Sequence, residues 1–119
     1  MTKNLSIAPP AGTAAPTPPT ISSITAGRGS ATVNFAVPTG NGGSAIVAYT
    51  ATCTASHQTT KTVAGAGSAL TLRGLKGGVS YTCTVTASNA YYTSAASNEQ
   101  MVKPQAGVTL TPILMLLLD

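Results

Sequence analysis

Apolar and polar residues alternate along the middle of the chain, and no segment repeats at helical spacing. Within residues 31–35, and again within 81–87, every second side chain is apolar while those between them are Thr or Asn. A period of two is typical of strands that bury one face and expose the other. The pattern therefore predicts an all-β protein.

Seven segments of this kind are separated by turn signals. Clusters rich in Gly, Asn and Ser interrupt the pattern at 40–44, 65–68 and 76–78. The predicted strands are 21–25, 31–35, 45–54, 59–63, 70–72, 79–87 and 95–103. Seven short strands with regular turns indicate a seven-stranded antiparallel β-sandwich of two sheets.

Proline-rich segments flank the strands. Five prolines within residues 8–19 predict a stiff, extended linker with little capacity to pack. The motif Pro9-Pro10-Ala11-Gly12 is echoed 95 positions later by Pro104-Gln105-Ala106-Gly107, a spacing of about one sandwich module plus its linker.

This spacing suggests a division of the chain into three parts. The first is an N-terminal linker at 1–17, whose beginning is interpreted as the end of a preceding repeat. One domain occupies 18–104, and a C-terminal tail occupies 105–119. The tail ends in six apolar residues, 113–118, whereas a membrane-spanning helix needs about 20. No membrane span is therefore predicted.

Composition argues against an enzyme. Glu99 and Asp119 are the only carboxylate side chains, and Asp119 ends the chain, so catalysis by paired carboxylates or by a Ser-His-Asp triad is excluded. The glycine clusters join strands and do not open helices, as a phosphate-binding loop would. We predict no catalytic residues and no cofactor.

The charge pattern gives no sign of a nucleic-acid partner. Net charge is +4 and the pI is about 9.4, but the six cationic residues are scattered and never form a run. We interpret the high pI as a shortage of acids and not as a basic binding face.

Several motifs resemble the fibronectin type III family, over about residues 18–104. Residues 72–81, Leu-Arg-Gly-Leu-Lys-Gly-Gly-Val-Ser-Tyr, match the family's two leucines, glycine turn and the tyrosine that opens the sixth strand. Residues 30–35 resemble its second strand, with Phe35 where the family usually has Trp. Residues 41–46, followed by Tyr49, resemble the third strand of bacterial members, and 95–98 resemble their last strand.

The resemblance implies a specific arrangement. The first, second and fifth strands would form one sheet, and the other four would form the second. The loops at 38–44, 65–68 and 88–94 would gather at one end. Tyr81 and Leu75 would form a tyrosine corner, in which the ring of Tyr81 is buried and its hydroxyl bonds to nearby backbone.

On that fold, the third and sixth strands are antiparallel neighbours, which places Cys53 and Cys83 inward near the same end. We predict a disulfide between them, which would stabilise the fold by roughly 3–4 kcal/mol and implies an oxidising compartment. The alternative is two free thiols packed as small apolar side chains. His57 completes at most three zinc ligands with these cysteines, so we predict no metal and an exposed His57 in a turn.

Tyr91 and Tyr92 are the sharpest candidates for binding, together with Asn89 and Asn41 in candidate binding loops. Adjacent aromatic side chains on a loop offer a large contact area at low entropic cost, and they could also stack on a sugar ring. Alternatively, one tyrosine packs against the neighbouring loop and the other rests on the surface.

The function expected from these observations is that of a non-catalytic spacer or adhesion module in an exported, multi-repeat bacterial protein. Its location would be extracellular or at the cell surface. Its partners would be neighbouring repeats and another protein or glycan at the cell surface. The alternative is a carbohydrate-binding accessory domain of a secreted polysaccharide-degrading enzyme.

Overall fold

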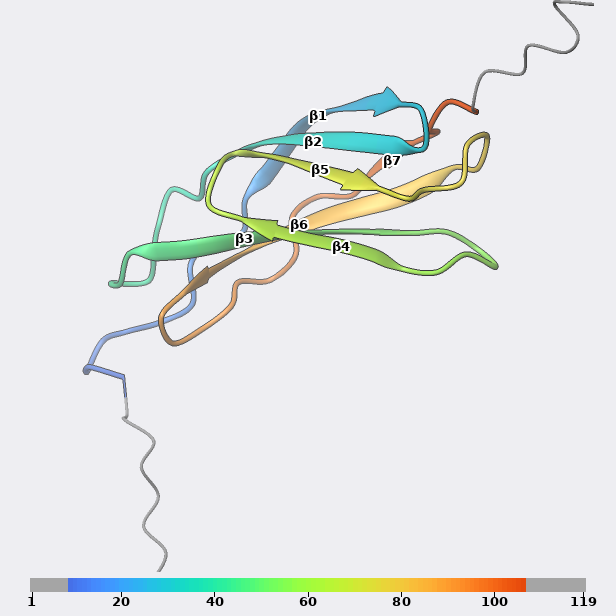
Figure 1. The fold of residues 1–119 in the computed structure, drawn as a ribbon. Helices are drawn as coiled ribbons and strands as arrows, with labels where there is room; N and C mark the ends of the chain where they lie inside the picture. The colour runs from blue at the N-terminus through green and yellow to red at the C-terminus, as the bar shows by residue number, and fades with distance from the viewer. Residues whose placement is uncertain (1–8, 107–119) are drawn as a thin grey trace, which may run out of the picture.

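Residues 9–106 are described by a computed structural model, in which they form two antiparallel sheets and no helix (Figure 1). The strands are β1 Thr20–Gly27, β2 Ser30–Ala36, β3 Ile46–Thr54, β4 Lys61–Gly65, β5 Ala69–Arg73, β6 Tyr81–Asn89 and β7 Gln100–Val102. One sheet has the order β1-β2-β5 and the other β4-β3-β6-β7. The predicted fold class and the division of strands between sheets are confirmed.

The alternation seen in the sequence is the inside–outside alternation of the sheets. Along β6 every odd-numbered residue from Tyr81 to Asn89 is buried, and the residues between them are only partly covered. The rings of Phe35 and Tyr49 meet in the core with their centroids 4.9 Å apart. Phe35 is buried, so it occupies the interior where the family usually has the larger Trp.

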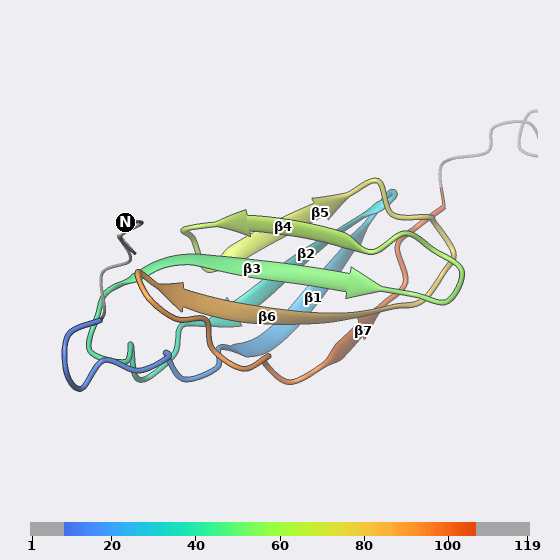
Figure 2. The ribbon, with the colours of Figure 1, turned by 90° about the horizontal axis from the view of Figure 1, so that it is seen from below.

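The sandwich has two distinct ends, which Figure 2 shows side-on. We call the end at which the chain enters the entry pole; it consists of residues 13–17, 37–45, 66–68 and 89–93. The opposite end is the exit pole, which consists of residues 27–30, 55–61, 73–80 and 103–106. The loops at 38–44, 65–68 and 88–94 all lie toward the entry pole, as the family resemblance implied.

The proline-rich segment before β1 is not free of the domain over its whole length. The backbone N–H groups of Ala14 and Thr17 donate to the carbonyls of Gly42 (2.8 Å) and Gly40 (2.9 Å), and Pro16 is buried. A Cβ on Gly42 would collide with the backbone oxygen of Ala14, so a glycine is needed for this close approach. The expectation of a linker with little capacity to pack is thus wrong for residues 13–17, which pack against the β2–β3 loop.

The segment after β7 is held in a similar way at the exit pole. The N–H of Gln105 donates to the carbonyl of Gly27 (2.8 Å), and the carbonyl of Gln105 accepts from Gly29 (3.1 Å). Pro104 is fully buried. A Cβ on Gly77 would collide with the backbone of Ala106, so this glycine allows the segment to lie against the β5–β6 turn.

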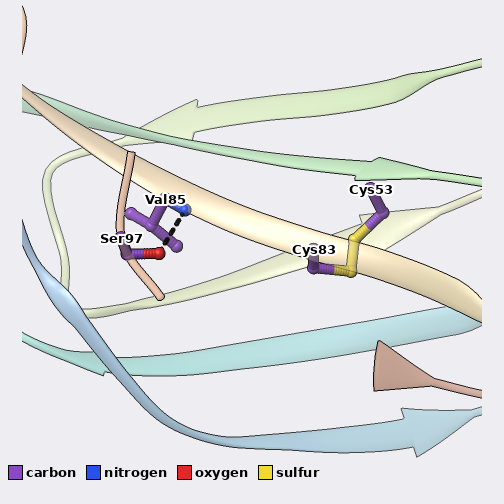
Figure 3. The surroundings of a disulfide bond; sticks show 4 residues. All are labelled: Cys53, Cys83, Val85 and Ser97. Atoms are coloured by element: carbon purple, nitrogen blue, oxygen red, sulfur yellow. Dashed lines mark hydrogen bonds between the residues drawn. A yellow bond between two sulfur atoms is a disulfide. The ribbon is translucent and has the colours of Figure 1, made fainter. Parts of the chain in front are cut away.

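The last strand is shorter than the predicted 95–103. Only Gln100–Val102 pair as a regular strand with β6, because the segment before them uses serine side chains in place of backbone groups. The hydroxyl of Ser97 accepts from the N–H of Val85 (2.9 Å), and that of Ser94 accepts from the N–H of Ala87 (2.9 Å). Figure 3 shows the Ser97 contact.

Within residues 9–106, no helix is long and apolar enough to cross a membrane. Two sequence-based predictions lie outside the described residues: the apolar stretch 113–118, and the interpretation of the first residues of the chain as the end of a preceding repeat.

Candidate functional site

Tyr91 and Tyr92 lie at the entry pole, in the loop between β6 and β7. Their side chains are 40% and 41% exposed, so neither is buried. The alternative left open by the sequence was that one tyrosine packs against the neighbouring loop while the other rests on the surface. The two are equally exposed, so the structure does not divide them in this way.

Asn89 holds this loop in place. Its carboxamide oxygen accepts hydrogen bonds from the N–H groups of Tyr91 (2.9 Å) and Tyr92 (2.8 Å). Its Nδ2 donates to the carbonyls of Ala14 and Asn41, both at 2.9 Å. The side chain is 5% exposed and uses its full capacity of two donors and two acceptors.

Asn89 is consequently a scaffold residue. Its proposed place among ligand-binding residues needs correction, because no donor or acceptor remains free for a ligand. The signal for a binding residue was its position in a loop beside two tyrosines, and sequence alone does not reveal that its side chain turns inward.

Asn41 has a mixed role. Its Oδ1 accepts from the N–H of Gly43 (2.8 Å), which fixes a local turn, while the residue as a whole is exposed. Three segments distant in sequence thus meet through Asn89: residues 13–17, which we call the entry segment, the β2–β3 loop and the β6–β7 loop. The tyrosine pair stands on this junction.

At the opposite end, Tyr81 makes the geometry of a tyrosine corner. The side chain is 1% exposed, and its hydroxyl accepts a hydrogen bond from the N–H of Lys76 at 2.9 Å. Leu75, just before that amide, is buried as well. The contact fixes the β5–β6 turn to the start of β6.

Cys53 and Cys83 form a disulfide, as predicted (Figure 3). The two residues are direct partners in the β3–β6 ladder, with Cα atoms 4.1 Å apart. Both are fully buried. The bond links the two central strands of the four-stranded sheet.

His57 is exposed in the turn after β3 and has a positive φ of 61°. Both sulfur atoms that could have joined it around a metal are used in the disulfide. Residues 9–106 contain no group of three or more His, Cys, Asp or Glu that could hold a metal ion. Their surface has no pocket either, so a ligand would have to bind to a loop or an open surface.

Sequence reasoning missed a set of structural polar residues near β7. Ser94, Ser97 and Asn98 replace ladder bonds: Oδ1 of Asn98 accepts from the N–H of Ile21 (2.8 Å), and its Nδ2 donates to the carbonyl of Ile21 (3.2 Å). This joins the edge of one sheet to the edge of the other. The available signal was the resemblance of 95–98 to the last strand of the family, although that resemblance does not reveal what these side chains do.

Two antiparallel sheets of three and four strands, with a tyrosine corner, define an immunoglobulin-like β-sandwich. The chain belongs to the fibronectin type III family, since the model of the fibronectin type III domain matches residues 14–102.

Solved structures with a similar fold include parts of titin and of twitchin. The chain is 22% identical to a structure of titin kinase and its flanking domains, with a TM-score of 0.62. The matched region covers 76% of this chain and 17% of the titin chain. For domains A168–A170 of titin the identity is 25%, the TM-score 0.61 and the coverage 75% and 32%. For the twitchin kinase region of C. elegans the identity is 20% and the TM-score 0.66, and the match covers 77% of this chain and 17% of that one.

These likenesses show the fold. The chain spans between about a sixth and a third of the length of these three solved chains, so their kinase regions say nothing of its own activity. No curated protein matches the chain. Fibronectin type III domains are generally non-catalytic structural or interaction modules of multidomain proteins.

Proposed function

We propose that this domain is a spacer and interaction module in an exported, multi-repeat bacterial protein. The observation that carries the proposal is the docking of the flanking segments: residues 13–17 are hydrogen-bonded to the entry pole and 103–106 to the exit pole. Because the chain enters at one end and leaves at the other, neighbouring modules would be held in line with few free residues between them.

Three further observations support the proposal. The buried Cys53–Cys83 disulfide favours an oxidising compartment outside the cytoplasm. The motif echo at a spacing of 95 residues favours a repeated module. The resemblance of residues 41–46 to bacterial members favours a bacterial source.

The spacer role is tested by amide hydrogen exchange on the whole chain. The N–H groups of Ala14, Thr17 and Gln105 should exchange as slowly as amides at strand ends, because each is hydrogen-bonded. Gly77→Ala should speed exchange at Gln105, since the added methyl group pushes residues 105–106 away. Gly67→Ala is the control, as a Cβ there meets nothing within 4 Å. Fast exchange at all three amides in the natural protein would contradict a docked spacer.

The interaction role rests on the tyrosine pair and is tested by a Tyr91→Ala/Tyr92→Ala double variant. Binding to whole cells or to a glycan array that the double variant loses would support the adhesion role. Binding only to neutral polysaccharides would favour the alternative of a carbohydrate-binding accessory domain, which the two half-exposed rings also fit. If the natural protein binds nothing, the spacer role alone survives.

A further inference from the structure

The fold gathers the cationic side chains at one end of the molecule. Although they are spread along the sequence, all five cations among residues 9–106 belong to the exit pole or its rim: Arg28, Lys61, Arg73, Lys76 and Lys103. The entry pole has no charged side chain. The high pI still reflects a shortage of acids, but the scattered order of the cations in the chain gave no sign that the fold places them at one end.

Hydrogen bonds between three segments bring these positions together. Arg28 lies in the β1–β2 turn, in which the carbonyl of Gly29 accepts a hydrogen bond from the N–H of Leu75 (2.9 Å). This bond joins the β1–β2 turn to the β5–β6 turn, which carries Lys76. Residues 104–106, which we call the exit segment, follow Lys103 and pair with residues 27–29. The carbonyl of Pro104 in this segment accepts the N–H of Gly78 (2.8 Å).

The remaining two cations lie at the margin of this junction. Arg73 is the ladder partner of Ser30, at the end of β2 nearest the turn. Lys61 lies beside Gly74, where a Cβ would be 3.5 Å from its Nζ. Lys61 is half-buried, and the other four side chains are exposed.

No acidic side chain neutralises this surface from within it. Glu99 is the one carboxylate side chain among residues 9–106, and it precedes β7. Four residues of extended chain separate it from Lys103, roughly 13 Å at about 3.3 Å per residue. One carboxylate is set against five cations among these residues, so the pole keeps a net positive charge even where Glu99 comes near Lys103. The basic pole is thus available to an external anion.

We propose that the exit pole binds an anionic polysaccharide, one with carboxylate or sulfate groups along its chain. Cations on separate turn tips suit an extended polymer with repeated charges, and the neighbouring exposed hydroxyls, such as Ser80 and Thr60, suit its polar groups. Single-stranded nucleic acid is less well matched, because the exposed tyrosines, the strongest platforms for base stacking in the described residues, lie at the other end.

The inference deepens the proposed function, on whose extracellular location it rests, by naming a class of partner. It also separates two surfaces. Tyr91 and Tyr92 stand at the entry pole, so their removal should leave binding at the exit pole unchanged.

The test measures binding of the whole chain to heparin and hyaluronan oligosaccharides by calorimetry. An Arg73→Gln/Lys76→Gln variant should bind roughly 25-fold more weakly, at roughly fivefold per cation near an anionic surface. An Ala66→Glu/Ser68→Glu variant, with the same change in net charge on the exposed turn at the other end, should bind within about threefold of the natural protein because its charges lie beyond the screening length. Raising the salt concentration should weaken binding of the natural protein.

Three results would overturn the inference: no binding at low salt, equal losses in the two variants, or competition by duplex DNA and anionic lipid vesicles as strong as that by the oligosaccharides. Should the first variant fail to unfold cooperatively, Arg28→Gln/Lys103→Gln replaces it. Failure of this test leaves the spacer proposal intact, because hydrogen exchange tests that proposal. Export is tested separately by the thiol state of the protein isolated from its own host. Two cysteines that can be alkylated without prior reduction would contradict export.

Discussion

Asn89 is a buried carboxamide that connects three chain segments. Its four hydrogen bonds reach both tyrosine amides, the entry segment and the β2–β3 loop. Removal of such a group leaves its partners to find water at a partly covered site, which costs free energy at each of them. A single side chain thereby joins the candidate binding loop to the two other segments at this end.

Asn89→Ala should lower the free energy of unfolding by roughly 2–3 kcal/mol, since several partners lose their bonds together. Asn41→Ala removes only the turn bond to Gly43 and should cost less than about 1 kcal/mol. Urea unfolding measures both. Equal losses would show that the junction does not depend on the carboxamide of Asn89.

A second residue-scale prediction concerns the tyrosine corner. Tyr81→Phe keeps the buried ring but leaves the N–H of Lys76 without its acceptor, so it should destabilise the fold by roughly 1–2 kcal/mol. Tyr92→Phe makes the same chemical change on an exposed ring and should lie within about 0.5 kcal/mol of the natural protein. Thermal unfolding of the two variants compares them directly, and a Tyr81→Phe variant as stable as Tyr92→Phe would contradict the role of the hydroxyl.

At the scale of elements, β6 is paired by a regular strand at its start and by serine side chains further on. Ser94 and Ser97 each accept one N–H of β6 through the hydroxyl, and each donates its own N–H to the same β6 residue. The two serines are three positions apart in sequence, whereas their partners Val85 and Ala87 are two positions apart in β6. The segment therefore covers the edge of the sheet without continuing the ladder.

Ser97→Ala should leave the buried N–H of Val85 unpaired and cost roughly 1–3 kcal/mol, with a similar cost for Ser94→Ala at Ala87. Ser88→Ala removes a hydroxyl that makes an exposed hydrogen bond with the hydroxyl of Thr93, so it should change stability by less than about 0.5 kcal/mol. Hydrogen exchange at Val85 and Ala87 gives a second readout: it should accelerate only in the matching variant. Unchanged exchange there would contradict the pairing.

Strict alternation predicted which residues face the core better than it predicted where a strand begins. For β2 the predicted 31–35 lies within Ser30–Ala36, whereas for β6 the predicted 79–87 was two residues early against Tyr81–Asn89, because Val79 continues the apolar pattern and Asn89 does not. For β4 the prediction of 59–63 was two residues early, because the run of polar residues before Val63 has no alternation to fix its bounds. The length of β7 was out of reach since a serine hydroxyl can replace a backbone carbonyl without any change in the apolar pattern.

The candidate sites show the same limit for a different reason. Pairing of Cys53 with Cys83 follows once two strands are known to be neighbours, because burial and register then place both side chains. The basic exit pole depends on four turns and strand ends that meet only in three dimensions, and residues 28 to 103 show no run of charge. The inward turn of Asn89 likewise depends on the position of the entry segment, 75 residues away in the chain.

At the scale of the whole molecule, one covalent bond contributes to a small core with a single Phe and no Trp. The Cys53–Cys83 bond has a sequence separation of 30, and closing a loop of that size in the unfolded chain corresponds to roughly 3–4 kcal/mol in the chain-entropy account. Small domains have unfolding free energies of about 5–15 kcal/mol, so the bond supplies a large fraction of the stability of the folded domain.

A Cys53→Ala/Cys83→Ala variant should therefore keep the fold at 25 °C but unfold at markedly lower urea concentration, with a loss of roughly 3–4 kcal/mol. The natural protein treated with dithiothreitol gives the matched comparison. Because both sulfur atoms are fully buried, the native bond should be reduced slowly, and the rate should rise with urea as the chain opens. Rapid reduction without denaturant, detected by mass spectrometry of the alkylated thiols, would instead show that the four-stranded sheet opens readily between β3 and β6, and the rigid in-line spacer would lose its physical basis.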